Sequence, residues 1–319
     1  MLSETTRAGA DSNLSHSDPQ SGLCMVKGNV RPRGHLIFVG ATGEGDALVR
    51  LDQRDSARRD HMTDAGCDIV VSFDFDAEEV WIGEDPANAG RPGTLSQGTY
   101  GAKVAVPLLL DMLGRLDLPA TFFVPGRVGE RHPARVEQIV AARHEIAHHG
   151  FTHTAPTRLS PDEEEAELVR GRDVLTALGG QVVGYRSPSW DFSPVTLDLL
   201  VRHGFRYSSN LMDDVRPYRH SAHDIVELPV HWTLDDAPHF WFSGASWTKT
   251  IRTSAEVRAL WEEEFLGIKA LGGLFMLTLH PQIIGRPGRL MMLESFLTWL
   301  RDQPGARFST AAQIAASVA

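Results

Sequence analysis

The chain has 319 residues, 42% of them hydrophobic and 23% charged, so it is long enough for one large domain or two small ones with a sizeable core. Its formal net charge of -10 argues against a nucleic-acid-binding surface and against a polybasic membrane patch. Two cysteines are too few for a disulfide framework or a cysteine-rich zinc site, and they suit a reducing compartment.

The distribution of residues along the chain indicates how it divides into domains. Residues 1–62 are rich in Ser, Asp, Arg and Gly and would bury too little apolar surface to offset the entropy of ordering, so we expect a low-order N-terminal extension. One catalytic domain is expected over residues 65–319. No apolar run approaches the ~18 residues of a membrane span, and residues 1–20 lack the apolar stretch of a signal peptide. We therefore expect a cytoplasmic protein that binds neither membrane nor nucleic acid.

From residue 68 onwards, short apolar runs typical of buried strands alternate with segments of helical periodicity. The predicted strands are residues 68–73, 119–125, 145–147, 182–186, 205–209, 225–230, 274–279 and 307–308. The predicted helices are residues 100–116, 133–142, 160–178, 193–204, 256–271, 289–302 and 311–318. Such alternation predicts an α/β fold with a parallel sheet, and seven or eight units in about 250 residues favour a closed but irregular (β/α) barrel.

Two histidines, His149 and His153, lie four residues apart just after the third predicted strand. On a helical turn this spacing places both imidazoles on one face, near enough to share a metal ion. The third ligand should be an oxygen donor, and the best candidates are in residues 72–78, which contain Asp74 and Asp76. Taken alone, such a histidine pair is more often a set of ordinary surface and core residues than a metal site.

The position of the polar residues strengthens the metal-site interpretation. Active sites of (β/α) barrels lie at the C-terminal ends of the strands. Six candidate residues fall at or just past predicted strand ends: Asp74, Asp76, His149, Arg186, Trp232 and His280.

Five blocks of sequence, in this order, resemble the motifs of the polysaccharide deacetylase superfamily. They are Ser-Phe-Asp-Phe-Asp at 72–76, His-Gly-Phe-Thr-His at 149–153, Gly-Tyr-Arg-Ser-Pro-Ser-Trp at 184–190, the segment 228–236, and Leu-His-Pro at 279–281. The resemblance covers about residues 68–316 and implies an irregular (β/α) barrel that hydrolyses amides with a metal ion. It is closest to the branch of peptidoglycan deacetylase, cofactor-independent allantoinases and cyclic imide hydrolases. The marks of that branch are Asp-Phe-Asp in place of adjacent aspartates and the run Gly-Arg-Pro-Gly-Arg at 285–289.

The resemblance implies a role for each motif residue. A divalent ion, Zn²⁺ by default for nitrogen and oxygen ligands, would polarise the amide carbonyl and acidify a water molecule. Asp74 is implied to be the general base, held ionised and oriented by Arg186, and His280 the general acid. The implied metal ligands are Asp76, His149 and His153.

Four further residues are candidates for contacting the substrate. Trp190 and Trp232 would wall the pocket, although simple packing explains them about equally well. Asp236 would orient His280 or the substrate. The turn at Tyr100 would carry a backbone donor near the oxyanion. The run 285–289 is most simply a turn before a helix, with an anion contact through its arginines as the minority alternative.

Three functions compete at this point. The first is a metal-dependent deacetylase-like hydrolase acting on a small-molecule or short N-acylated substrate. The second is a cyclic amidohydrolase of the allantoinase or imidase kind, and the branch includes members thought to work without a metal. The third, a binding or scaffold protein without catalysis, is disfavoured because no motif position is lost. The resemblance also implies a homo-oligomer, as a tetramer.

Overall fold

The computed structural model of the chain describes residues 66–242 and 250–318. The predicted N-terminal extension, residues 1–62, lies outside the described residues. No helix in the described ranges is long and apolar enough to cross a membrane.

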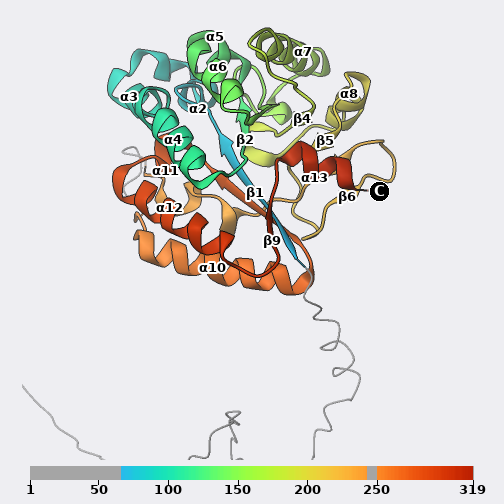
Figure 1. Ribbon diagram of the computed structural model, residues 1–319. Helices are drawn as coiled ribbons and strands as arrows, with labels where there is room; N and C mark the ends of the chain where they lie inside the picture. Colours follow the sequence, from blue (N-terminus) through green and yellow to red (C-terminus); the bar gives the residue numbers. More distant parts are fainter. Residues whose placement is uncertain (1–65, 243–249, 319) are drawn as a thin grey trace, which may run out of the picture. The chain divides into compact units, whose positions relative to one another are not determined.

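A curled half-barrel sheet organises the domain, with most of the helices outside it (Figure 1). In the described ranges the strand order is β6-β7-β5-β4-β3-β2-β1-β8, and β9 pairs with β1. All pairs are parallel except β6 with β7. The strands are β1 (Cys67–Asp74), β2 (Thr121–Val124), β3 (Glu145–His148), β4 (Gly184–Tyr185), β5 (Tyr207–Ser208), β6 (Tyr218–Arg219), β7 (Val226–Glu227), β8 (Leu274–Leu279) and β9 (Ala306–Phe308).

The α/β barrel class predicted from the sequence is confirmed, but the expected closure is not complete. The terminal strands of the sheet order, β6 and β8, do not pair with each other in the described part of the chain. Only isolated backbone contacts cross the opening: the Leu274 N–H donates to the Val215 carbonyl at 2.8 Å, and Asp235 forms a single bridge with Thr278. The loops at this opening are therefore held individually rather than by a continuous ladder.

Helices surround the sheet, most of them on its outer face (Figure 1). They are α2 (Glu79–Glu84), α3 (Pro92–Tyr100), α4 (Val106–Leu116), α5 (Gly126–Arg131), α6 (Pro133–Ala141), α7 (Pro161–Ala177), α8 (Thr196–Arg202), α9 (Ala237–Phe240), α10 (Ser254–Leu271), α11 (Pro281–Ile284), α12 (Pro287–Arg301) and α13 (Ala311–Ser317). Helix α7 begins as its sequence predicts, with Ser160 as N-cap, Pro161 in the first turn and a reciprocal capping box to Glu163.

Strand β1 divides its side chains between two apolar layers, because successive residues of a strand point to opposite faces. Residues Cys67, Ile69, Val71 and Phe73 belong to the large core that includes helices α4, α10 and α12. Val70 belongs instead to the cluster inside the curl of the sheet, with Phe123 and Met276. Asp74 shares this inner face by the same alternation. The pleat of β1 therefore directs the Asp74 carboxylate into the barrel.

The predicted helix at residues 100–116 is wrong in its start and its continuity. Helix α3 begins at Pro92 and ends at Tyr100, and a π turn over Gly101–Ala105 joins it to α4. Pro107 has no backbone N–H and cannot donate to the carbonyl four residues back, so a uniform α-helix cannot run through this position.

The middle strands are shorter than predicted, and β6 was not predicted at all. The predicted strand 225–230 is reduced to β7, because Pro229 has no N–H with which to continue a ladder. Strand β6 has only two residues: Tyr218 is half-buried and Arg219 is exposed. So short and polar a strand shows no hydrophobic pattern from which it could be predicted.

Candidate functional site

The two histidines of the predicted metal motif lie on a loop that follows β3, not on the helical turn that their spacing suggested. Gly150 (φ +72°) and His153 (φ +58°) are left-handed, a conformation that no α-helix contains. These left-handed residues reverse the direction of the chain, and this reversal brings His153 back beside His149, with 5.1 Å between ring centres.

Two neighbours hold this loop in place. Glu167 of α7 accepts the backbone N–H groups of Phe151 and Thr152 at 2.9 and 2.7 Å. On the other side, Gly83 of α2 packs so closely that a Cβ there would lie 2.5 Å from the His153 carbonyl oxygen. The loop therefore depends on a half-buried carboxylate and on a glycine rather than on helical hydrogen bonds.

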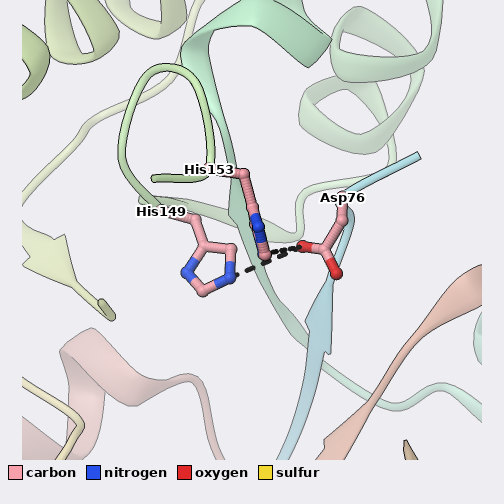
Figure 2. A group of neighbouring side chains, drawn as sticks. All are labelled: Asp76, His149 and His153. Carbon is pink, nitrogen blue, oxygen red and sulfur yellow. Dashed lines mark ion pairs between the residues drawn. The ribbon is translucent and has the colours of Figure 1, made fainter. Parts of the chain in front are cut away.

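Asp76 and the two histidines converge on one point (Figure 2). The Asp76 Oδ1 atom lies 3.5 Å from His149 Nε2 and 3.6 Å from His153 Nε2. Each residue offers one ligand atom, and these atoms all lie within 4.8 Å of one another. The predicted triad is thus assembled from the end of β1 and the loop after β3.

The hydrogen bonding of this triad and the neutral state of His149 favour a cation at its centre. His149 Nδ1 donates to the backbone carbonyl of Arg186 at 2.8 Å, which leaves its Nε2 lone pair facing Asp76. Burial lowers the pKa of His149 to about 4, so the imidazole is neutral. Both carboxylate oxygens of Asp76 are buried and have no hydrogen-bond partner in the described part of the chain. Unpartnered lone pairs facing one another fit a positive ion that binds them all.

Asp74 is ion-paired to Arg186 in the barrel interior. The Arg186 Nη1 atom donates to Asp74 Oδ1 at 2.7 Å and to Ser72 Oγ at 3.0 Å, and its Nη2 donates to Ser209 Oγ at 3.0 Å. Arg186 is fully buried and lies 4.0 Å from the ring centre of Phe123. Burial alone would raise the pKa of Asp74, but the arginine outweighs it and the pKa lies below its usual value. The predicted pairing is present, and Asp74 is an ionised carboxylate.

His280 faces the same point from the end of β8. Its Nδ1 lies 2.7 Å from Asp236 Oδ1 and 3.6 Å from Asp235 Oδ1, and its Nε2 lies 3.8 Å from Asp76 Oδ2. Burial would lower the pKa of His280, but Asp235 and Asp236 outweigh it and raise the pKa well above its usual value. The imidazole is therefore cationic and has a proton to give.

Asp235, Asp236 and His280 also lie close enough to hold a metal ion, but their contacts indicate a different arrangement. Asp236 is fully buried and accepts both the side chain and the backbone N–H of His280. Of the two alternatives from the sequence, this placement supports orientation of His280 and not contact with the substrate. The protonated histidine already donates to Asp236 and offsets part of the charge of the two carboxylates, so these contacts describe an oriented histidine.

These groups open onto a cavity of about 250 Å³. Trp190 and Trp232 stand together at its edge, with ring centres 4.5 Å apart, and Trp232 is 46% exposed. The walls predicted for the pocket are therefore present. The cavity is lined by Asp74, Asp76, Val80, His149, His153, Ser189, Trp190, Trp232, Asp235, Ala237, Trp241 and His280.

Tyr100 does not lie where the sequence suggested. It ends helix α3 instead of forming a turn, and it is not among the residues that line the metal cavity. Its hydroxyl donates to the Gly285 carbonyl at 2.8 Å, and the Arg286 guanidinium lies 3.8 Å from its ring centre. This placement gives no support to a backbone donor at the oxyanion.

Three residues near the site were missed from the sequence. Asp235 lies beside Asp236 in the motif block 228–236, so its position next to Asp236 could have indicated a place near the site. Trp241 lies in an aromatic run, Phe-Trp-Phe at 240–242, that resembles ordinary core sequence. Gln282 follows the His280-Pro281 pair and is 4% exposed, with no pattern to mark it.

Comparison with known proteins agrees with this geometry. The model of the polysaccharide deacetylase family matches residues 97–208. A peptidoglycan deacetylase of Helicobacter pylori is 30% identical over 280 residues, which cover 78% of this chain and 95% of that protein. A peptidoglycan deacetylase-like protein of Gibberella zeae is 27% identical over 272 residues, covering 73% of this chain and 80% of that protein.

Solved structures lead to the same family. A Mycobacterium smegmatis protein assigned to the polysaccharide deacetylases superposes with a TM-score of 0.77 at 40% identity, over 80% of this chain and 91% of that one. An allantoinase superposes with a TM-score of 0.69 at 20% identity, over 80% and 90% of the two chains, which shows a shared fold. The chain therefore belongs to the polysaccharide deacetylase family of deacetylase-like hydrolases.

Proposed function

We propose that this protein is a metal-dependent hydrolase of non-peptide carbon–nitrogen bonds that removes the acyl group from a small or short N-acylated substrate. Asp76, His149 and His153 would hold the ion, with Zn²⁺ as the first choice for one carboxylate and two imidazoles. When bound, the ion supplies electrophilic activation of the amide carbonyl and of a water molecule.

One observation carries the proposal. Asp76 is a fully buried carboxylate without a hydrogen-bond partner in the described ranges, and it faces two imidazole nitrogens 3.5 and 3.6 Å away. A buried carboxylate without a hydrogen bond costs roughly several kcal/mol, and native proteins seldom keep one without a purpose. A divalent cation at this point would satisfy all three groups together.

The other residues divide the proton transfers. Asp74 is ionised beside Arg186 and serves as the general base for water. Its second oxygen, Oδ2, lies 3.9 Å from His149 Nε2, so the base faces the proposed metal centre. His280 is protonated, and Asp236 orients its Nδ1, so its Nε2 is free to protonate the departing nitrogen. Trp190 and Trp232 would exclude water and position the acyl group.

A cyclic amidohydrolase is the second candidate, because the cavity suits a small ring. Its volume of about 250 Å³ lies just below the usual range for ligand pockets, roughly 300–1,000 Å³, and two indole rings form one edge. The same base and acid would open a ring amide or imide by the same attack.

The proposal is tested by a metal analysis alongside a hydrolysis panel. We expect one divalent ion per chain, and we expect its binding to be lost in Asp76→Asn but retained in the surface variant Asp302→Asn. The panel contains acetylated chitooligosaccharides, allantoin, hydantoins and succinimide, and turnover of the linear or the ring amides separates the two candidates. A chain that binds no divalent ion in calorimetry contradicts the metal assignment.

His280→Ala is expected to lower turnover while sparing metal binding, because the imidazole serves the leaving group. The loss should be ~10²–10⁴ on acetamido substrates, the usual worth of one proton-transferring group, and much smaller on cyclic imides. An imide nitrogen leaves as an anion stabilised by its remaining carbonyl, so it needs the proton less. Steady-state kinetics on both substrate kinds measure the difference, and equal losses on both would count against the assignment of His280.

A further inference from the structure

A second cavity, of about 310 Å³, adjoins the metal cavity. Trp241 lines both cavities, so the two share a wall. Trp81 stacks on this indole with 5.0 Å between ring centres and, with Phe240 and Ile283, makes the second cavity largely apolar on one side. Nothing in the proposed chemistry uses this space.

The other side of the second cavity carries two arginines, Arg286 and Arg289. The Arg286 guanidinium lies 3.8 Å from the ring centre of Tyr100, and that of Arg289 lies 4.4 Å from the ring centre of Phe240. Arg289 also donates to the Ile283 carbonyl at 3.0 Å. Within the described ranges, neither guanidinium has a carboxylate at ion-pair distance. Two like charges therefore share one cavity, and the acidic group that acts on Arg289, Asp236, does so from beyond ion-pair distance.

Two further observations point to an anionic ligand. Gln282 lines the same cavity and is 4% exposed; its amide acts on the Asp76 carboxyl, but neither of its polar atoms completes a hydrogen bond in the part of the chain described. Arg286 is the N-cap of the long helix α12, and no side chain caps that end, so the partial positive charge of the helix terminus adds to the arginines. Buried polar groups without partners are rare unless a ligand or water completes them.

We propose that this second cavity binds a carboxylate group carried on a small apolar body. Arg286 and Arg289 would contact the carboxylate, because the guanidinium fork matches its two oxygens, and the aromatic wall would cover the body. The carboxylate belongs either to the acyl substrate itself, reaching past Trp241, or to a separate small acid. The first source rests on the proposed function, and the second does not.

Calorimetric titration of the full-length protein with benzoate tests the site without any hydrolysis. We expect saturable binding of one benzoate per chain, and no comparable binding of the neutral analogue benzamide. Arg286→Gln should lower the affinity for benzoate by about tenfold to a hundredfold, which is the usual effect of losing a charged hydrogen-bond partner. Arg286→Lys, which keeps the charge but not the fork, should weaken the binding of benzoate less than Arg286→Gln does, whereas a collapsed cavity would lose binding in both variants.

Arg301→Gln is the matched control, because Arg301 lies on the same helix and is 47% exposed. It should leave benzoate affinity unchanged. Benzoate that bound only at the metal would be insensitive to Arg286→Gln, and that result, or equal binding of benzamide, would overturn the proposal.

Inhibition kinetics then identify the source of the carboxylate. If benzoate raises only the KM of the best substrate, the cavity holds part of that substrate. If it changes kcat without competing, the ligand is a separate acid. Should the hydrolysis panel fail altogether, the calorimetric result still stands, so failure of the site and failure of the proposed function are distinguished.

Discussion

Asp74→Asn is expected to lower turnover on the best substrate by ~10²–10⁴ while leaving the fold and metal affinity intact. The amide is nearly isosteric and can still accept from Arg186, whose other donors keep Ser72 and Ser209 as partners. The proposed metal ligands, Asp76 and the two histidines, do not change. What is lost is the one ionised carboxylate placed to take a proton from water.

Two variants bracket this result. Asp76→Asn should lose metal affinity as well as rate, because a neutral amide replaces the only anionic ligand of the proposed triad. Asp302→Asn, at a 70% exposed side chain, should change neither. Steady-state kinetics and a calorimetric metal titration on all three proteins make the comparison, and a negligible rate loss for Asp74→Asn would overturn its assignment as base.

Arg186→Met should lower the free energy of unfolding by ~3–5 kcal/mol at neutral pH, because it leaves the Asp74 charge buried and unpaired. Arg186 and Asp74 are 0% and 3% exposed, so water cannot compensate for the loss. Urea unfolding measures the effect. Arg301→Met, at a half-exposed arginine, should stay within about 0.5 kcal/mol of the natural protein. The double variant Arg186→Met with Asp74→Asn should recover part of the loss, because it removes the unpaired charge as well.

Arg186→Met should also reverse the direction in which Asp74 makes the free energy of unfolding depend on pH. In the natural protein the pKa of Asp74 is below its ordinary value of 3.8, so its stabilising effect is present above that value and is lost as pH falls. Without Arg186, burial dominates and raises the pKa above 3.8, so the variant loses stability as pH rises through that range. The difference between the two proteins should therefore be smallest in acid and largest near neutral pH. A difference independent of pH would contradict the ion pair as its cause.

Sequence periodicity predicted the long strands best where both of their faces are buried. Strand β8 has the predicted bounds, residues 274–279, and all six of its residues are buried. The two-residue strands β4, β5 and β7 were predicted too long, since their ladders are cut short by loops that turn into the site. Periodicity describes burial, and burial continues in these loops after strand geometry has ended.

The site residues that belong to sequence motifs could be predicted. Those that reach the site only through the packing of distant segments could not. Asp74, Asp76, His149, His153, Arg186 and His280 are brought together as the strand-end argument predicted. The helical turn inferred from the spacing of His149 and His153 was wrong, because a left-handed residue can close the same distance. Gln282 and Trp241 carry no local signal, since only the packing of α9 and α11 against the cavities gives them a role.

Arg186 connects the two halves of the chemistry through different parts of one residue. Its backbone carbonyl sets which nitrogen of His149 carries the proton, while its side chain sets the charge of Asp74. Anyone transplanting this centre into another barrel would thus have to copy a main-chain position as well as side chains. The end of β4 would therefore have to be transferred too. A graft of Asp74, Asp76 and the histidines alone would fix neither the tautomer of His149 nor the charge of Asp74.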